Sequence, residues 1–529
     1  MIRIGQSYRK HPPEGKYDAI VIGSGVGGLS VAALLARHAG RRVLILERHY
    51  MPGGFTHVFR RCGYEWDVGV HYIGGVGSRR SATRRLIDHV TDGSLEWASM
   101  GDVYDRIILG ENTYDYVAGP EAFARRMKEY FPSEAAAIDR YLDLTKRAKK
   151  WSGLYFAEKA VPSVIATVAG GLMRMPFLNY ARRTTKSVLD ELTDNVELKG
   201  VLTGQYGDYG LPPGRSSFGM HAILTRHYLR GGFYPIGGSS AIAASIAPMI
   251  EKAGGEIHFQ AEVTEILVQR GRAVGVRMSD GREIEAPVVI SDAGVHNTFL
   301  RLLSREAAGR HKSVERAVET PFSVAHLCLY VGFKHTAAAL DLPKTNLWIY
   351  PGPDHDANVE AFVADPEAPL PVVYVSFPAA KDPSFEANHP GRATVELITL
   401  APYDRFAPWA GTEWRKRGEE YETLKASLAE RMLGALERQL PGLKDKIDYM
   451  EISTPLSTRH FTGYEHGEIY GLDHSPARFL NRSLRPRTAI PGLFLTGQDV
   501  ASCGVAGAMA GGYLAGSAIL GKNLLKAAQ

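Results

Sequence analysis

The stretch GGFTHVFRRCGYEWDVGVHYIGG, residues 53–75, combines a high glycine content with side chains that can move protons. Among these, His71 and Tyr72 come shortly before its last two glycines. Histidine and tyrosine can transfer a proton to or from a reacting group, whereas glycine lets a backbone approach another group closely. We predict that this backbone lies against a bound ligand and that His71 or Tyr72 transfers the proton. A hydrogen bond that only orients the loop is the alternative role for His71.

A second group of titratable residues lies in TPLSTRHFTGYEHGEIYGLDHSPARF, residues 454–479. Glu468 is the next candidate for proton transfer, and His460 is a further one. The histidines of this segment are spaced H-x5-H-x7-H, which is not the spacing of two ligands on one helix face. No cysteine lies nearby, so we predict no metal site.

The first element that could position these residues is a strand, a glycine turn, a helix and a second strand within residues 17–50. The turn holds the pattern G-x-G-x-x-G, formed by Gly23, Gly25 and Gly28, with Ser24 inside it. Such glycines let a pyrophosphate approach the N-terminus of the helix. We predict a dinucleotide site here. A glycine-rich turn without a ligand is the alternative.

An acidic residue, Glu47, ends the second of these strands and is followed by Arg48. A carboxylate at this position can accept hydrogen bonds from the ribose of a dinucleotide. Its presence strengthens the prediction, because an isolated G-x-G-x-x-G pattern is a weak signal.

The C-terminal segment IPGLFLTGQDVASCGVAGAMAGGYLAGSAILGKNLL has a similar form. A short apolar strand at 493–495 leads to Gly497 and Asp499, and a helix rich in small residues opens at Gly504 and Val505. Small residues let the N-terminus of that helix come close to a polar ligand. Tight packing of an Ala/Gly helix is the alternative.

A third segment, residues 254–298, alternates strand-like runs with RG and DG turns. It contains Val263 and returns to a buried strand at 288–291, directly before Asp292. We expect it to contribute to the same nucleotide-binding unit.

Several strings are more specific than these patterns. The strings are GGFTHVF, DVGVHYIGG, GGFYPIGGSSAIA, VISDAGVHNTF and LTGQDVASCGVAGA. Together with PGG at residues 52–54, they resemble flavoproteins of the amine-oxidase and phytoene-desaturase type. Within these, the chain resembles the retinol saturase branch, which neighbours carotenoid isomerases and bacterial phytoene-desaturase-like proteins.

This resemblance implies FAD as the cofactor. It places Gly53 and Gly54 along the ribityl chain and ring, and the backbone at Val263 against the adenine. Asp292 would lie near the same nucleotide half, and Asp499 would bind the ribityl chain or the pyrophosphate. The full predicted set of cofactor-binding residues is Gly23, Ser24, Gly25, Gly28, Glu47, Arg48, Gly53, Gly54, Val263, Asp292, Gly497, Asp499, Gly504 and Val505, the last two facing the flavin pyrimidine ring.

The resemblance also implies the fold class, an α/β Rossmann-type FAD-binding domain assembled from residues 1–80, 230–300 and 485–529. Residues 81–229 would form a helical insert, and residues 301–484 an α+β substrate domain with a mixed or antiparallel sheet. Strands are predicted at 322–333, 345–351, 371–378 and 393–403. Residues 412–442 predict an amphipathic helix with Thr412 as a possible N-cap.

A membrane-facing role is predicted for the apolar, Gly/Pro-interrupted segment 145–186, which has basic residues at both ends. Basic flanks around an apolar face suit a helix lying in the membrane interface. A buried helical pair with solvated ends is the alternative. The net charge of +5 is too small to indicate nucleic-acid binding, and no apolar run reaches the roughly 20 residues of a membrane span. We expect a cytoplasmic protein that associates peripherally with membranes.

The family resemblance implies an FAD-dependent oxidoreductase that exchanges hydride with carbon–carbon bonds of a hydrophobic polyene or fatty-acyl lipid, as a saturase or desaturase. A second G-x-G-x-x-G unit for NADPH is absent from the sequence. Electrons would therefore come from or go to a quinone, oxygen, a small carrier or a partner protein. Two alternatives stay open, a redox-neutral polyene cis–trans isomerase and a flavin-free lipid-chain escort protein of the same fold.

Overall fold

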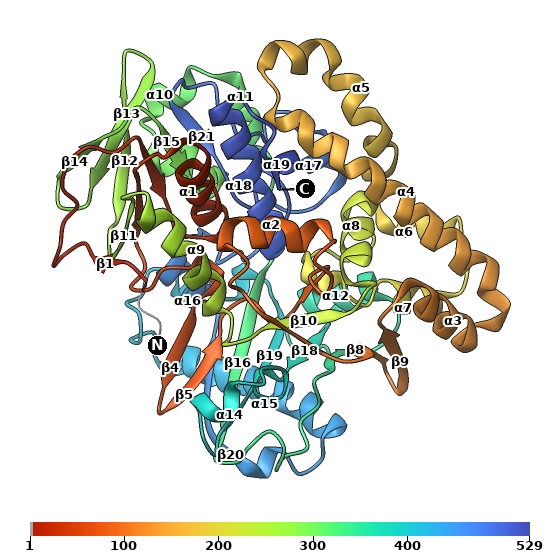
Figure 1. The fold of residues 1–529 in the computed structure, drawn as a ribbon. Helices are drawn as coiled ribbons and strands as arrows, with labels where there is room; N and C mark the ends of the chain where they lie inside the picture. Colours follow the sequence, from red (N-terminus) through yellow and green to blue (C-terminus); the bar gives the residue numbers. More distant parts are fainter. Residues whose placement is uncertain (1–3, 529) are drawn as a thin grey trace.

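The computed structural model describes residues 4–528, apart from the side chains of residues 163–165. Its first layer is a six-stranded sheet in which all neighbouring strands are parallel. The strand order is β1-β11-β3-β2-β15-β21, with bounds Gln6–Ser7 (β1), Ala19–Ile22 (β2), Val43–Glu47 (β3), Glu256–Phe259 (β11), Val289–Ser291 (β15) and Leu493–Leu495 (β21). The strands come from residues 1–80, 230–300 and 485–529, so three distant parts of the chain form one sheet (Figure 1).

Both faces of this sheet are covered, as the continuous burial of its apolar strands requires. Helices α1, α9 and α18 pack on one face, and a three-stranded sheet, β12-β13-β14, lies on the other. The bounds are Val26–Ala39 (α1), Ser240–Lys252 (α9), Gly504–Leu520 (α18), Val263–Gln269 (β12), Arg272–Met278 (β13) and Glu283–Glu285 (β14). The carboxyl ends of β2, β3, β15 and β21 therefore meet at one open edge.

The second layer is a seven-stranded mixed sheet with the order β20-β16-β19-β18-β17-β8-β9. Only the β17–β8 pair is parallel. The bounds are Ile447–Ser453 (β20), Ala325–Phe333 (β16), Ala393–Ala401 (β19), Val373–Ser376 (β18), Asn346–Tyr350 (β17), Val103–Leu109 (β8) and Asn112–Val117 (β9). The four strands predicted in the substrate domain are confirmed, and β8 and β9 join them from within residues 81–229.

One face of this sheet packs against α15, Glu419–Gln439. The prediction of an amphipathic helix is confirmed, but the predicted N-cap at Thr412 is wrong. The helix begins after Gly418, whose φ of +90° interrupts the helical path, while the Thr412 hydroxyl donates a hydrogen bond to Trp409 O in the preceding turn.

The helical region contains a hairpin of α4 (Ala135–Ala160) and α5 (Ser163–Ala181), which projects at the upper right of Figure 1. Helix α8, Phe218–Tyr228, packs against both. Other bounds are Val58–Arg61 (β4), Tyr64–Asp67 (β5), Ile73–Gly74 (β6), Ala82–Thr91 (α2), Trp97–Ser99 (β7), Pro120–Tyr130 (α3), Thr185–Asp190 (α6), Val196–Leu202 (α7), Gly232–Pro235 (β10), Arg305–Gly309 (α10), Lys312–Val318 (α11), His355–Ala364 (α12), Pro378–Lys381 (α13), Phe385–Asn388 (α14), Pro455–Thr462 (α16), Pro476–Leu480 (α17) and Leu524–Ala527 (α19).

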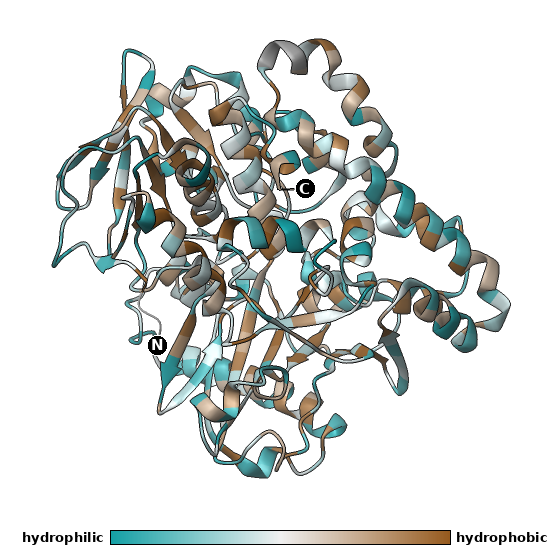
Figure 2. Cartoon of the chain, in the orientation of Figure 1, coloured by the Kyte–Doolittle hydropathy of each residue, from teal (hydrophilic) through white to brown (hydrophobic). Residues whose placement is uncertain are grey.

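Hydrophobic residues concentrate in the buried strands and also recur along the outer helix α5 (Figure 2). Within residues 4–528, no helix has both the length and the hydrophobicity that crossing a membrane requires.

Candidate active site

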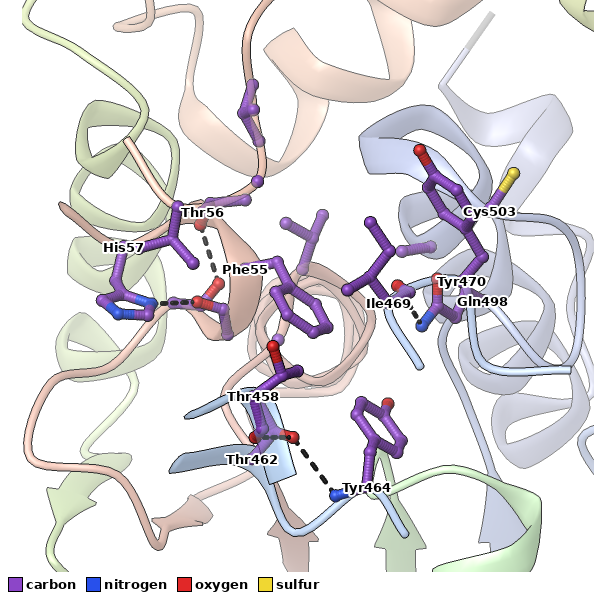
Figure 3. A pocket seen from close by; sticks show the side chains of 18 of the residues that line it. Phe55, Thr56, His57, Thr458, Thr462, Tyr464, Ile469, Tyr470, Gln498 and Cys503 are labelled. Carbon is purple, nitrogen blue, oxygen red and sulfur yellow. Dashed lines mark hydrogen bonds between the residues drawn. The ribbon is translucent and has the colours of Figure 1, made fainter. Parts of the chain in front are cut away.

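A cavity of about 690 Å³ lies between the open edge of the parallel sheet and the seven-stranded sheet. One end is lined by the dinucleotide turn and the ends of the parallel strands, including Gly25, Glu47 and Asp292. Further along, aromatic side chains such as Phe55 and Tyr464 are directed into it (Figure 3). The cavity therefore has two parts. We call the part lined by Gly25, Glu47 and Asp292 the cradle, and the part lined by aromatic residues such as Phe55 and Tyr464 the aromatic chamber.

Two helix N-termini face this cavity. Helix α1 begins after Gly25 and α18 after Cys503, and neither N-cap residue bonds the first turn through its side chain. Residues of both first turns line the cavity. The first N–H groups of a helix lack partners within it and carry positive potential. Both ends therefore suit the pyrophosphate and the electron-rich pyrimidine ring of FAD, and the arrangement fits this cofactor.

Two of the predicted glycines explain how a ligand could approach so closely. Gly504 has a φ of +78°, and a Cβ there would meet no described atom within 4 Å, so the space beside this backbone belongs to the cavity. Gly54 has a φ of +55°, and its Cβ would lie 2.9 Å from Gly25 Cα. A side chain at Gly54 would therefore displace the dinucleotide turn.

Glu47 has a fixed orientation at the end of β3. Its Oε2 accepts hydrogen bonds from Ser24 N at 2.9 Å and Ser24 Oγ at 2.7 Å, and its Oε1 accepts one from His49 N at 2.8 Å. Ser24 is buried and does not line the cavity, so it acts by holding Glu47.

Asp292 and Asp499 bring two more carboxyl groups to the cradle. Asp499 accepts hydrogen bonds from Val295 N at 2.7 Å and Leu472 N at 3.0 Å, so it also holds loops together. Loss of solvent, followed by the charges of Glu47 and Asp499, raises the pKa of Asp292 to about 8. Asp292 is therefore neutral at pH 7, which limits negative charge beside the dinucleotide turn.

The other predicted cofactor residues fall into two groups. Gly23, Gly53, Val263, Val505 and Arg48 line the cavity, and Arg48 also pairs with Glu262 at 3.6 Å. Gly28 and Gly497 do not line it. A Cβ on Gly28 would meet Gly23 O and one on Gly497 would meet Asp292 Oδ1, so these two glycines allow α1, the sheet and the 497 turn to pack closely.

Of the proton-transfer candidates, His71 and Tyr72 line the cavity. The Nδ1 atom of His71 lies 2.7 Å from Glu396 Oε2. The Tyr72 hydroxyl lies within hydrogen-bond distance of two carboxyl groups, with its oxygen 2.9 Å from Asp105 Oδ2 and 3.0 Å from Asp208 Oδ2. Burial lowers the pKa of His71 to about 4 and raises that of Tyr72 well above 10. Both side chains are therefore neutral at pH 7.

The two candidates from the second string lie elsewhere. Glu468 is buried and accepts a hydrogen bond from His466 N at 2.9 Å, but it does not line the cavity. His460 stacks on Trp414 with ring centroids 4.9 Å apart and lines a separate pocket beside Arg48. The fold therefore does not bring these two residues together with His71 and Tyr72.

Several residues around the cavity escaped the sequence analysis. They are His326, Trp348, Asp105, Lys381 and Glu396. A detectable signal existed for Glu396, because a charged residue within the apolar run ATVELITL is unusual in a buried strand. The same signal existed for His326, which stands within the buried apolar strand AHLCLYVGF, whereas the local pattern does not distinguish Asp105, Trp348 and Lys381.

Comparison with known proteins agrees with this geometry. The sequence model of the family described as "Flavin containing amine oxidoreductase" matches residues 26–293. An all-trans-retinol 13,14-reductase of Danio rerio is 36% identical over 526 residues, which cover 96% of this chain and 86% of that protein. The chain belongs to this flavin-dependent oxidoreductase family. It is accordingly an FAD-dependent oxidoreductase, so the flavin-free escort hypothesis is not retained.

Other relatives carry names that state different activities. A Danio rerio protein named "Inactive all-trans-retinol 13,14-reductase" is 31% identical, with 98% of this chain and 88% of that protein covered. A chloroplastic prolycopene isomerase of Arabidopsis thaliana is 27% identical, with 93% and 81% covered. Among solved structures, a putrescine oxidase bound to putrescine has a TM-score of 0.62 at 16% identity, covering 96% of this chain and 100% of that one, and shows the shared fold.

Proposed function

We propose that this chain saturates a carbon–carbon double bond of a polyene that carries a hydroxyl group. The retinol reductases that it resembles support this proposal, because retinol is a polyene alcohol and reduction at positions 13,14 is saturation of a double bond. FAD bound in the cradle would supply the hydride to one carbon. The protein must then supply a proton to the other carbon.

The observation that carries the proposal is a pair of buried polar atoms in the aromatic chamber. His326 Nδ1 and Trp348 Nε1 have no hydrogen-bond partner among the described residues, and the two side chains are only 8% and 2% exposed. Both residues line the cavity. Leaving such a group unpaired costs about 1–3 kcal/mol. Both atoms are closed off from the cavity surface, so a hydroxyl group on the ligand would pair with either of them after a movement of the His326 or Trp348 side chain, whereas a pure hydrocarbon could not pair with them at all.

His71 is the residue best placed to supply the proton. Its Nδ1 is occupied by Glu396, and its Nε2 has no hydrogen-bond partner in the described part of the chain. A neutral imidazole protonated on Nε2 presents that N–H to the cavity. Tyr72 has its hydroxyl held by Asp105 and Asp208, so we assign it a structural role in the cavity wall.

A redox-neutral cis–trans isomerase is the second candidate function. It is favoured by the prolycopene isomerases among the relatives and by the absence of a second G-x-G-x-x-G pattern from the sequence. In the saturase direction, the chain instead requires an electron donor such as a quinol or a small carrier. In the desaturase direction it would require an acceptor such as a quinone or oxygen.

An anaerobic visible spectrum separates these functions. The FAD-loaded protein is reduced chemically, freed of excess reductant, and mixed with all-trans-retinol as the probe. Return of the oxidised flavin band together with a product that has one double bond fewer supports saturation. A geometric isomer formed without any return of the band would establish the isomerase instead. Equal turnover of a polyene hydrocarbon would contradict the hydroxyl requirement.

We also propose that the α4–α5 hairpin docks on an anionic membrane surface. Val168 and Leu172 on α5 are 83% and 81% exposed, and Trp151, Leu154, Met175 and Leu480 are further exposed apolar side chains on α4, α5 and α17. Exposed lysines and arginines flank this apolar surface, namely Lys146, Lys150, Arg182 and Lys186. Apolar insertion combined with basic flanks is the composition of interfacial helices.

Vesicle flotation tests the docking proposal. The wild-type protein is expected to float with vesicles that contain phosphatidylglycerol, and the double variant Val168→Glu/Leu172→Glu is expected to stay at the bottom. Val363→Glu on α12 is the matched control, because Val363 is also largely exposed but lies outside the hairpin. Equal flotation of wild type and double variant would refute the proposal.

A further inference from the structure

A row of polar side chains crosses the seven-stranded sheet beside the aromatic chamber. Glu396 on β19 lies opposite Tyr330 on β16 and opposite Ser376 on β18, and Asn346 on β17 lies opposite Asp105 on β8. Glu396, Ser376, Asn346 and Asp105 are fully buried, and Tyr330 nearly so. Polar groups in such a position are stable only when they bond to one another.

Lys381 connects the middle of this row. It is the last residue of α13, the short helix that follows β18, and it is almost completely buried. Its Nζ donates to Ser376 Oγ at 2.8 Å, to Asn346 Oδ1, and to His71 O at 3.0 Å. The Asn346 amide in turn donates to Asp105 Oδ1 at 2.7 Å. Lys381 thus joins the two middle residues of the row, Ser376 and Asn346, to the loop that carries His71.

The loop from Asp67 to Tyr72 lies over the row and is attached along its length. Glu396 accepts a hydrogen bond from Asp67 N at 2.7 Å and also contacts His71 Nδ1. Tyr72 bonds to Asp105 at the other end. The row therefore reaches the cavity through His71, as well as at Tyr72 and Tyr330, and Glu396 lies directly behind His71.

The environment of Glu396 favours a protonated carboxyl group. The titratable groups facing it are Asp67 (β5), His71 (following loop), Tyr234 (β10), Cys328 and Tyr330 (β16), Tyr374 (β18) and Lys381 (α13). Burial raises the pKa of Glu396 to about 8, and the nearby Lys381 cation counteracts this. Burial lowers the pKa of Lys381 to about 7. A neutral Glu396–His71 pair, in which the Glu396 O–H donates to His71 Nδ1, avoids placing a carboxylate and an imidazolium in a buried site without water.

We propose that Glu396 is the proton source behind His71, and that Lys381 is a positioning residue which sets the protonation of Glu396. The proposal rests on the saturase function above. As the His71 Nε2–H bond breaks, its proton forms a C–H bond on the substrate, and His71 Nδ1 takes the proton of Glu396. Reduced FAD, when bound in the cradle, would supply the hydride for the other carbon of the double bond, so that oxidation of the flavin would balance reduction of the alkene. The Glu396 carboxylate that remains is stabilised by Lys381 and Asp67 N–H, and solvent later returns its proton.

Infrared spectroscopy of the FAD-loaded protein tests this proposal without a substrate. A protonated Glu396 gives a carboxylic-acid carbonyl band at pH 7 that is missing from the isosteric variant Glu396→Gln. Because the lysine cation favours the carboxylate, Lys381→Met should move the disappearance of that band to higher pH. A merely structural role of Lys381 would leave the titration of the band unchanged. Asp473→Asn is the matched control, since Asp473 is a buried carboxyl group that does not line the cavity.

Single-turnover reoxidation of the reduced flavin by all-trans-retinol provides the second measurement. Glu396→Gln is expected to slow it by about 10²- to 10⁴-fold, the usual contribution of general acid catalysis. An absent carboxyl band, or an unaltered rate in Glu396→Gln, would overturn the relay. If Lys381→Met fails to fold, Glu396→Gln still decides the proposal, because its side chain has nearly the same shape. A protein that shows the band but never reduces a polyene would disprove the saturase function while the neutral Glu396–His71 pair stands.

Discussion

Replacement of Gly504 by alanine tests whether a ligand lies against the N-terminus of α18. Alanine at a φ of +78° costs roughly 1–2 kcal/mol of backbone strain in any left-handed position. Apart from its own chain neighbours and helix backbone, the added Cβ meets no atom of residues 4–528 within 4 Å, so the substitution adds no clash with the surrounding fold. If the flavin contacts this backbone, the Cβ instead overpacks the cofactor, at a cost of about 1–3 kcal/mol.

This cost corresponds to a dissociation constant for FAD that is about 5- to 150-fold higher. The assay is fluorescence titration of apoprotein with FAD, together with thermal unfolding of the apoprotein. Gly281→Ala is the control, because Gly281 has a φ of +86° with nothing within 4 Å of its Cβ and lies in the turn between β13 and β14. Both variants should lose similar apoprotein stability, and only Gly504→Ala should lose affinity for FAD. Equal FAD affinity in the two variants would refute the assignment of this helix N-terminus to the cofactor.

Three further predictions concern the site. The pKa of Asp292 is raised to about 8, so this carboxyl group gains its negative charge as the pH rises through that value. The affinity for FAD should therefore fall between pH 7 and 9 in the wild-type protein but not in Asp292→Asn. A parallel fall in both proteins would contradict this prediction. His71→Gln should slow reoxidation of the reduced flavin by about 10²- to 10⁴-fold with FAD affinity unchanged in the titration, and retention of the wild-type rate would remove His71 as proton donor. Trp348→Phe removes the unpaired indole N–H. It should raise the KM for a polyene alcohol by roughly 2- to 10-fold, as loss of one hydrogen bond predicts, and leave the KM for a matching hydrocarbon unchanged. Equal effects on the KM of both substrates would indicate a packing role.

The FAD cradle could be predicted from the sequence because its chemistry is local. Gly23, Gly25 and Glu47 act within one strand–helix–strand unit, and the order of residues along such a unit determines where they lie in space. Gly504 similarly opens a helix directly after a short buried strand and its turn. Short-range geometry and apolar patterning were therefore sufficient to predict the dinucleotide turn, whereas the assembly of the sheet from three distant segments was implied by the family resemblance.

Local patterns could not show which of the candidate proton-transfer residues lie at the cavity. The sequence made His71 or Tyr72 the first candidate and Glu468 the next, without showing whether either side chain reaches the cavity. Only the fold places His71 on the cavity and Glu468 outside it. The reason is that the two strings pack against different elements, and the sequence does not specify the distance between them.

The polar row was decided by tertiary structure alone. Asp105, Asn346 and Glu396 stand on strands separated by long inserts, and they align only because of the registers β8–β17, β17–β18 and β18–β19. A shift of one residue in any of these pairings would turn side chains of the row to the opposite face of the sheet. The sequence by itself determined the dinucleotide turn and the position of Glu47 through contacts between neighbours in the chain. Strand register, which depends on contacts across hundreds of residues, decided which buried acid stands behind His71.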